Sequence, residues 1–192
     1  MTNVLLISGS LRRVSYNTSL LRAAADAEPR VAFDLWDGLK AVPPYDEDDD
    51  REPAPEAVTQ LRAAVAEADA VLFATPEYNS SVPGQLKNAL DWLSRPLATN
   101  PLRNKPVAVI GASTGAFGAV WAQAELRKVL SATGARVLDV ELAVGQAAAR
   151  FDGDGRLLDE DVRAQLAEIV EALSVEAVAR VGAAALEPVR AA

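Results

Sequence analysis

The sequence contains no cysteine and no histidine among its 192 residues. Without cysteine the chain can form no disulfide, no thiolate metal site, no iron–sulfur cluster and no cysteine nucleophile. Without histidine it has no imidazole to act as a general base or as a metal ligand. Its chemistry therefore depends on hydroxyl, carboxyl, amide, amine and guanidinium groups, on the backbone, or on a bound cofactor.

Basic residues are also few, because 19 Lys and Arg stand against 27 Asp and Glu and give a net charge of −8. This balance argues against a nucleic-acid partner, which needs clustered cations to neutralise phosphates, and against an anionic membrane surface. No run approaches the roughly 20 apolar residues of a membrane span. A signal peptide has a basic segment before its apolar run, and the first apolar run of this sequence has none before it. We expect a soluble, cytoplasmic protein.

Short apolar runs alternate with amphipathic segments along the chain. The runs cover 3–8, 30–37, 68–75, 105–112 and 135–142, and the amphipathic segments cover 17–28, 55–68, 83–95, 119–134 and 159–181. A strand followed by a helix, repeated five times, predicts βαβ units and a parallel sheet. The chain is therefore expected to have an α/β fold.

The apolar runs differ in a way that predicts their places in the sheet. Runs 3–8, 68–75 and 105–112 are continuously apolar, as strands buried on both faces are, whereas 30–37 and 135–142 alternate like edge strands. The flavodoxin-like order 2-1-3-4-5 places the first, third and fourth strands in the centre, in agreement with this pattern.

We expect one flavodoxin-like domain over residues 1–181, and a C-terminal tail over 182–192 that is frayed or packed on a neighbouring subunit. The Pro-rich segment 43–55 carries an acidic run from Asp46 to Asp50. Such a run can bind a divalent cation or a partner, but a solvated loop is the usual structure and is expected here.

The loop "GSLRRVSYN" (9–17) follows the first strand, beside the point where the strand order reverses and ligands bind. It leads into a helix for which Asn17 is the expected N-cap, and free N–H groups at a helix start bind anions. The loop lacks both G-x-G-x-x-G and G-K-[ST], so a monophosphate is the expected ligand. Its candidate ligand groups are those of Ser10, Arg12, Ser15, Asn17 and Thr18.

The loop "PEYNSSVPG" (76–84) follows the third strand and is stiffened by its two prolines. Tyr78 offers an aromatic surface and Asn79 offers amide hydrogen bonds, so the loop can line the edge of a planar ring. Glu77 is the one carboxylate near this site, and as a general acid it has no visible partner. A Pro-ordered turn in which Tyr78 only packs is an equally good interpretation.

The sequence "GASTG" (111–115) matches the G-x-S-x-G nucleophile elbow of serine hydrolases. A nucleophilic serine needs a base, and the chain has no histidine. The lysines Lys87 and Lys105 are expected on a helix and at the far end of a strand. We therefore reject the hydrolase interpretation and expect Ser113, Gly115 and Gly118 to let a flat ligand approach the backbone.

The three loops together predict a phosphorylated planar cofactor, and FMN fits that description. Its chemistry would reside in the flavin N5, which accepts hydride from a nicotinamide and needs no histidine or cysteine. The alternative is a flavodoxin-like electron-transfer module, which would hold FMN and exchange electrons with protein partners without oxidising a nicotinamide.

The motifs "GSLRRVSYN", "PEYNSSVPGQLKNALDWLSR" and "GASTGAFG" closely resemble the NADPH-dependent FMN reductase family, over about residues 3–150. The resemblance implies noncovalent FMN, NADPH or NADH as electron donor, and a quinone, azo compound, chromate or free flavin as acceptor in a ping-pong reaction. It also implies a homodimer or homotetramer. Trp92 and Trp121 are then either interface anchors or packing residues.

The resemblance also implies roles for individual residues. The FMN phosphate would be held by Arg12, Ser15, Asn17 and Thr18, with Ser10 nearby. The ring and ribityl chain would be lined by Pro76, Glu77, Tyr78 and Asn79, and Ser113 and Gly115 would approach the flavin from the third loop.

Overall fold

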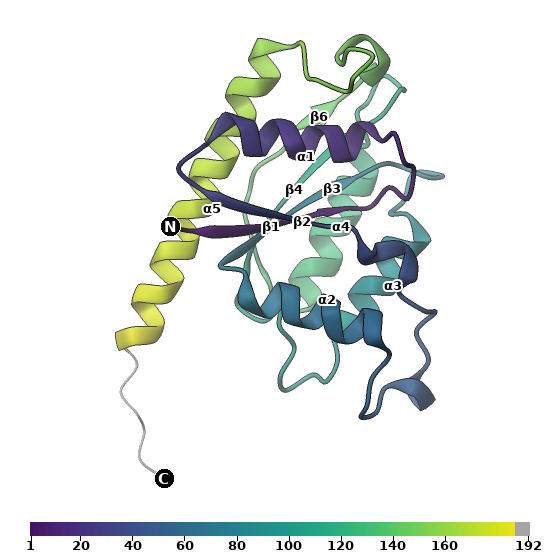
Figure 1. Ribbon diagram of the computed structural model, residues 1–192, viewed down its shortest axis with the longest axis vertical. Coiled ribbons are helices and arrows are strands. Elements are labelled where there is room, and N and C mark those ends of the chain that lie inside the picture. The colour runs from purple at the N-terminus through teal and green to yellow at the C-terminus, as the bar shows by residue number, and fades with distance from the viewer. Residues whose placement is uncertain (187–192) are drawn as a thin grey trace.

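A computed structural model describes the backbone of residues 1–186 and the side chains of residues 1–180. Strands and helices alternate along the chain (Figure 1). The elements are β1 (Asn3–Ser8), α1 (Tyr16–Ala27), β2 (Ala32–Trp36), α2 (Glu56–Glu67), β3 (Ala70–Thr75), α3 (Gly84–Leu93), β4 (Pro106–Ala112), α4 (Val120–Ala132), β5 (Arg136–Val137), β6 (Ala143–Val144) and α5 (Glu160–Leu186). Short 3₁₀ helices cover Gly38–Ala41, Glu47–Asp49 and Ala147–Ala149.

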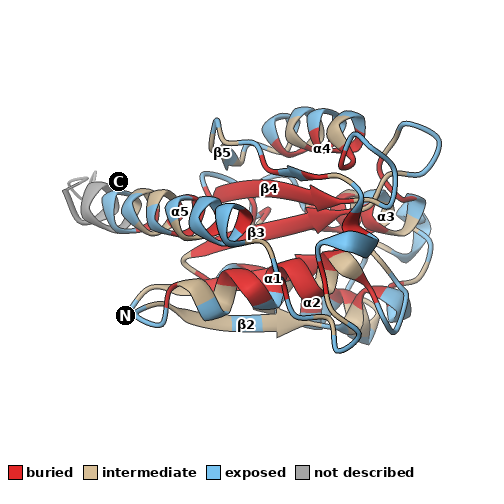
Figure 2. Ribbon diagram, turned by 90° about the horizontal axis from the view of Figure 1, so that it is seen from above, coloured by how far each residue is buried: buried red, intermediate tan, exposed pale blue. Residues whose placement is uncertain are grey.

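The strands form a parallel sheet in the order β2-β1-β3-β4-β5, which confirms the expected flavodoxin-like arrangement. Every residue of β3 and β4 is buried, whereas β2 at the edge is only partly covered (Figure 2). The continuous apolar runs therefore lie in the centre of the sheet, because only there do both faces of a strand need apolar side chains.

Helices cover both faces of the sheet, α1 and α5 on one and α2, α3 and α4 on the other (Figure 1). Successive residues of one strand enter opposite cores, so Leu6 lies in the same core as Leu20 and Leu166, while Leu5 lies in the other core with Leu61 and Leu90. The sheet is thus packed between two apolar layers, and the loops at the carboxyl ends of its strands extend from this packed core. Among residues 1–186, no helix combines the length and the apolar character that crossing a membrane requires.

The expected fifth strand over 135–142 is wrong in its extent. Only Arg136–Val137 pairs with β4 there, and a separate strand β6 pairs with β4 further along, at Gly111 and Ala112. Between the pairs Val107–Val137 and Gly111–Ala143, β4 advances four residues while its partner advances six. The two extra residues cannot stay in register, so the strand is interrupted between β5 and β6.

Two helix ends also differ from the expectation. The N-cap of α1 is Ser15, whose hydroxyl accepts a hydrogen bond from the Thr18 N–H, and not Asn17. Helix α5 continues to Leu186, past the expected domain end at residue 181. The tail was expected to be frayed or packed on a neighbouring subunit. Its last six positions, 187–192, lie outside the described residues.

Candidate functional site

The loops after β1, β3 and β4 meet at the carboxyl end of the sheet and surround a cavity of about 160 Å³. Eight of the eleven predicted site residues line it, namely Ser10, Arg12, Ser15, Asn17, Pro76, Glu77, Tyr78 and Ser113. The other three do not line it: Asn79 and Gly115 lie in the same loops, and Thr18 lies in the first turn of α1. Tyr16, Ala112 and Thr114 line the cavity without having been predicted, and each directly adjoins a predicted residue in the sequence.

The loop after β1 forms an anion cradle at the start of α1. The Ser15 hydroxyl caps the helix at the Thr18 N–H, 3.3 Å away, and the Ser10 hydroxyl accepts from the Arg12 N–H at 3.4 Å. Within the part of the chain that the structure describes, the Arg12 guanidinium has no ion-pair partner and is exposed. This cation and the first N–H groups of α1 can together bind a phosphate.

Asn17 connects the first loop to the third. Its amide nitrogen donates to the carbonyl of Ala112, and its amide oxygen accepts from the N–H of Ala112, both at 2.9 Å. The side chain is buried, so this pair of hydrogen bonds joins the start of α1 to the end of β4 away from water. Sequence reasoning placed Asn17 in the site but missed this bridge, because its partner lies 95 residues away.

The loop after β3 turns back on itself in a two-residue hairpin. Tyr78 and Ser81 exchange backbone hydrogen bonds of 3.1 Å in both directions. The two residues between them, Asn79 and Ser80, have positive φ angles of 53° and 60°, as the central residues of a type I′ turn do. Asn79 therefore forms the tip of the turn, while Tyr78, which is 50% exposed, lines the cavity.

Two carboxylates anchor this hairpin to helix α4. Glu77 accepts from the backbone N–H groups of Trp121 and Ala122, at 3.0 and 3.1 Å, and so caps the start of α4. Glu125 accepts from the Ser81 hydroxyl and the Val82 N–H, and these hydrogen bonds hold the pKa of Glu125 below its ordinary value. Glu77 is thus a helix cap as well as a residue that lines the cavity.

Ser113 has no base beside it among the described residues. Its hydroxyl accepts from the Gly115 N–H at 3.1 Å, Lys87 pairs with Asp91 on α3, and the ammonium of Lys105 donates to the carbonyls of Ala66 and Ala68. Lys105 lies just before β4, at the opposite end of the sheet from the cavity. The hydrolase interpretation therefore finds no support in the geometry.

The two glycines of the third loop have different roles. A Cβ on Gly115 would meet only the Ser113 hydroxyl at 3.5 Å, so the space beside it is open to a ligand. A Cβ on Gly118, whose φ is +58°, would lie 2.3 Å from the backbone of Ala143. The clearance at Gly118 is therefore filled by β6 and not by a ligand, and the prediction for Gly118 is wrong.

The two tryptophans that were candidates for interface anchors lie in different environments. Trp92 is completely buried, and its ring nitrogen donates to the carbonyl of Pro43 at 2.9 Å, so it is a packing residue. Trp121 is 48% exposed and meets Phe117 edge to face, with ring centroids 5.1 Å apart. Only Trp121 remains available to contact a second subunit.

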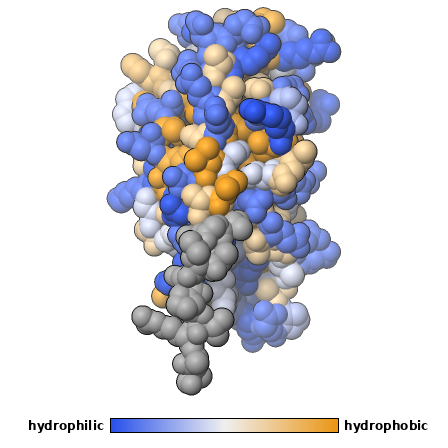
Figure 3. All heavy atoms as spheres, turned by 90° about the vertical axis from the view of Figure 1, so that its left-hand side faces the viewer, coloured by the Kyte–Doolittle hydropathy of each residue, from blue (hydrophilic) through white to orange (hydrophobic). Residues whose placement is uncertain are grey.

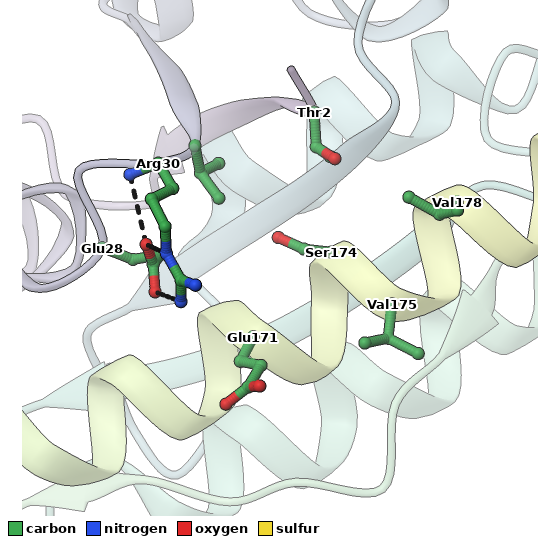
Figure 4. Close-up of a pocket in the computed structure, with 8 residues that line it drawn as sticks. Thr2, Glu28, Arg30, Glu171, Ser174, Val175 and Val178 are labelled. Carbon is green, nitrogen blue, oxygen red and sulfur yellow. Dashed lines mark hydrogen bonds and ion pairs between the residues drawn. The ribbon is translucent and has the colours of Figure 1, made fainter.

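A larger cavity of about 410 Å³ lies elsewhere, between α5 and the segments flanking β2 and β1 (Figure 4). Its walls include the Glu28–Arg30 ion pair and the exposed side chains of Val175 and Val178, on the face where Figure 3 shows apolar atoms gathered. The hydrogen bonds from Arg30 lower the pKa of Glu28 to about 2. Parallel sheets bind ligands at the carboxyl ends of their strands, so the smaller cavity is the candidate site.

Comparison with known proteins identifies the family of this chain. Residues 2–149 match the family described as NADPH-dependent FMN reductase. The chain belongs to this family. An NAD(P)H-dependent FMN reductase of Pseudomonas aeruginosa is 42% identical over 174 residues, which cover 90% of this chain and 93% of that protein. A 2-hydroxy-1,4-benzoquinone reductase of a Burkholderia species is 39% identical over 165 residues, which cover 85% of this chain and 89% of that protein.

A solved structure shows the same fold. The flavoenzyme NAD(P)H:(acceptor) oxidoreductase of Paracoccus denitrificans superposes with a TM-score of 0.84 at 36% identity, and the match covers 94% of this chain and 99% of that one. As a member of the FMN reductase family, the protein is an NAD(P)H-dependent oxidoreductase with FMN as its cofactor.

The residues of the cavity fit FMN. Arg12 and the α1 N-terminus suit its phosphate, and the open space at Gly115 beside Ser113 and Tyr78 suits a flat ring.

Proposed function

We propose that the protein oxidises NADPH or NADH and passes the electrons to a small quinone-type acceptor in a ping-pong reaction. When bound, FMN supplies the chemistry, accepting hydride at N5 and returning the electrons to the acceptor. The observation that carries the proposal is that one cavity unites an anion cradle with two loops able to border a planar ring. The names of the relatives support the choice of acceptor.

The first loop is proposed to hold the phosphate. Arg12 contributes the charge, and the first backbone N–H groups of α1 contribute hydrogen bonds and the positive end of the helix dipole. Because the Ser15 hydroxyl is already engaged as the N-cap, its proposed contribution to the phosphate is to fix the direction of those N–H groups.

The second and third loops are proposed to border the ring. Pro76, Tyr78 and Ser113 line the cavity and offer backbone groups, an aromatic side chain and a hydroxyl. Glu77 and Asn17 act through these loops as positioning residues, because the first ties the hairpin to α4 and the second ties the phosphate loop to β4. Rigid loops keep the ring in place for the hydride donor and the acceptor in turn.

We also propose that the protein works in the cytoplasm as a homodimer or homotetramer. The absence of cysteine suits a reducing compartment, where disulfides do not form. The exposed pair of Phe117 and Trp121 lies at the start of α4, where Glu77 connects it to the cavity, and aromatic side chains are favoured in interface centres.

The proposal is tested by comparing FMN with riboflavin, which lacks the phosphate. Fluorescence titration of the flavin-free protein is expected to show tighter binding of FMN, and Arg12→Gln should lose about tenfold to a hundredfold of that preference, as expected for a hydrogen bond to a charged group. Arg51→Gln, an exposed cation outside the cavity, is the matched control. Equal affinity of the native protein for both flavins would contradict the phosphate assignment.

The reaction sequence is tested by steady-state kinetics with a benzoquinone as acceptor. Ping-pong behaviour predicts parallel lines in double-reciprocal plots at several nucleotide concentrations. A protein that binds FMN but oxidises neither nucleotide would be a flavodoxin-like electron-transfer module instead, and the reductase proposal would fail.

A further inference from the structure

A second hollow of about 320 Å³ lies directly beside the flavin site and shares Ser10 and Arg12 with it. It is formed by the loop after β1, the first turns of α1 and the segment that follows β2. The two strands are paired up to Ile7 and Trp36, so these segments leave the sheet side by side. Ser10 and Arg12 therefore border both the flavin site and the hollow.

The hollow concentrates positive charge in an otherwise acidic chain. Four cationic side chains line it, those of Arg12, Arg13, Arg22 and Lys40, against the single carboxylate of Asp37. None of the four takes part in any of the ion pairs found in the described part of the chain. With a net charge of −8 for the whole chain, this local excess of unpaired cations favours an anionic ligand.

The flavin phosphate accounts for only part of this charge. Of the residues expected at that phosphate, Ser15 and Asn17 line only the neighbouring cavity, Ser10 and Arg12 line both spaces, and Thr18 lines the hollow. Of the four cations only Arg12 lines both spaces. Arg22 lies on the second turn of α1 and Lys40 in the 3₁₀ helix after β2, so neither lines the flavin site. Three cations thus remain for a second phosphate group.

We propose that this hollow binds the adenosine 2′-phosphate of NADPH and makes NADPH the preferred electron donor. The inference rests on the proposed function, which leaves the choice between the two nucleotides open. NADPH differs from NADH only by this phosphate, which carries up to two negative charges and three acceptor oxygens. Charged guanidinium groups bind such oxygens strongly, and Trp36 in the same hollow offers an aromatic surface to the adenine.

The double variant Arg22→Gln/Lys40→Gln tests the proposal. The ratio of kcat/KM for NADPH to kcat/KM for NADH is expected to fall at least tenfold, through a higher KM for NADPH. A binding measurement accompanies the kinetics. Calorimetric titration of the FMN-loaded protein should show adenosine 2′,5′-bisphosphate binding at least tenfold more tightly than 5′-AMP, and the double variant should lose that difference.

The matched control is Arg51→Gln/Lys128→Gln, which removes the same two side-chain types and the same net charge. Both residues are exposed, neither lines the hollow, and neither takes part in an ion pair of the described residues. The control is expected to keep the nucleotide ratio of the native protein. An equal fall in the control would show a general effect of charge and would overturn the proposal.

Other outcomes separate this proposal from the proposed function. If the native protein oxidises both nucleotides and the hollow variant keeps the native ratio, the hollow proposal fails and the reductase assignment stands. If the variant binds FMN more weakly and the ratio is unchanged, the hollow belongs to the flavin phosphate. If neither nucleotide is oxidised, the reductase assignment fails. The hollow proposal is then decided by the calorimetric titration alone, and equal affinities for the bisphosphate and for 5′-AMP would overturn it.

Discussion

Replacing Asn17 by alanine should weaken both the fold and the flavin site. The substitution removes two buried hydrogen bonds of 2.9 Å and leaves the N–H and the carbonyl of Ala112 without their partner. A typical hydrogen bond contributes about 1 kcal/mol net, and a buried polar group left unpaired costs about 1 to 3 kcal/mol. We expect the free energy of unfolding to fall by about 2 to 4 kcal/mol.

The same substitution should weaken FMN binding, because Asn17 joins the phosphate loop to the end of β4, where Ala112 and Ser113 line the cavity. Urea unfolding measures the loss of stability, and fluorescence titration at a temperature where the variant is folded measures FMN affinity. We expect FMN affinity to fall about tenfold, which corresponds to about 1.4 kcal/mol.

Asn88 provides the matched control, because its side chain makes the same kind of bridge away from the site. It accepts from the Tyr45 N–H at 2.7 Å and donates to the Pro43 carbonyl at 2.8 Å. Asn88→Ala should also lose stability, though less than Asn17→Ala because Trp92 still donates to the Pro43 carbonyl, and it should keep its FMN affinity. If Asn17→Ala were as stable as the native protein, or if both variants weakened FMN binding equally, the bridging role of Asn17 would be refuted.

Three further predictions follow from single contacts. Glu77→Ala removes the cap on α4 and should lower the free energy of unfolding by about 1 kcal/mol in urea, and an unchanged midpoint would contradict the capping role. Gly118→Ala should lower the free energy of unfolding by more than about 2 kcal/mol, because its Cβ would meet the backbone of Ala143, while Gly115→Ala should change it little. Equal losses in the two variants, measured by urea unfolding, would contradict the different roles given to the two glycines. Burial lowers the pKa of Lys105 from 10.5 to about 8. Between pH 8 and 10.5 the unfolded chain therefore binds more protons than the folded chain, so the free energy of unfolding rises with pH. The gain should be about 3 kcal/mol between pH 8 and 10.5, measured as the difference between the native protein and Lys105→Met, and parallel stability curves for the two would argue against it.

The central part of the fold could be predicted because its cause is local. The apolar runs that became β1, β3 and β4 are continuous in the sequence, and burial on both faces requires that continuity. The interruption between β5 and β6 could not be predicted in this way. It depends on the two extra residues between β5 and β6 relative to β4, and on backbone hydrogen bonds from the N–H groups of Gly111 and Ser113 to the carbonyls of Leu142 and Val144.

The site shows the same division between local and distant causes. Loop position after a buried strand was enough to find most of the residues that line the cavity. Their partners could not be found, because Glu77 caps a helix 44 residues further along and Asn17 bridges to a strand 95 residues away. Ser15 and Asn17 are both good capping residues two positions apart, and only the structure shows which of them caps α1.

The most direct test of the central claim is to mix the FMN-loaded protein with one equivalent of NADPH, and separately of NADH, in the absence of oxygen. The account predicts that the visible absorbance of oxidised flavin disappears with at least one nucleotide and that a benzoquinone, added after the nucleotide is consumed, restores it. A flavin absorbance that neither nucleotide changes would contradict the account.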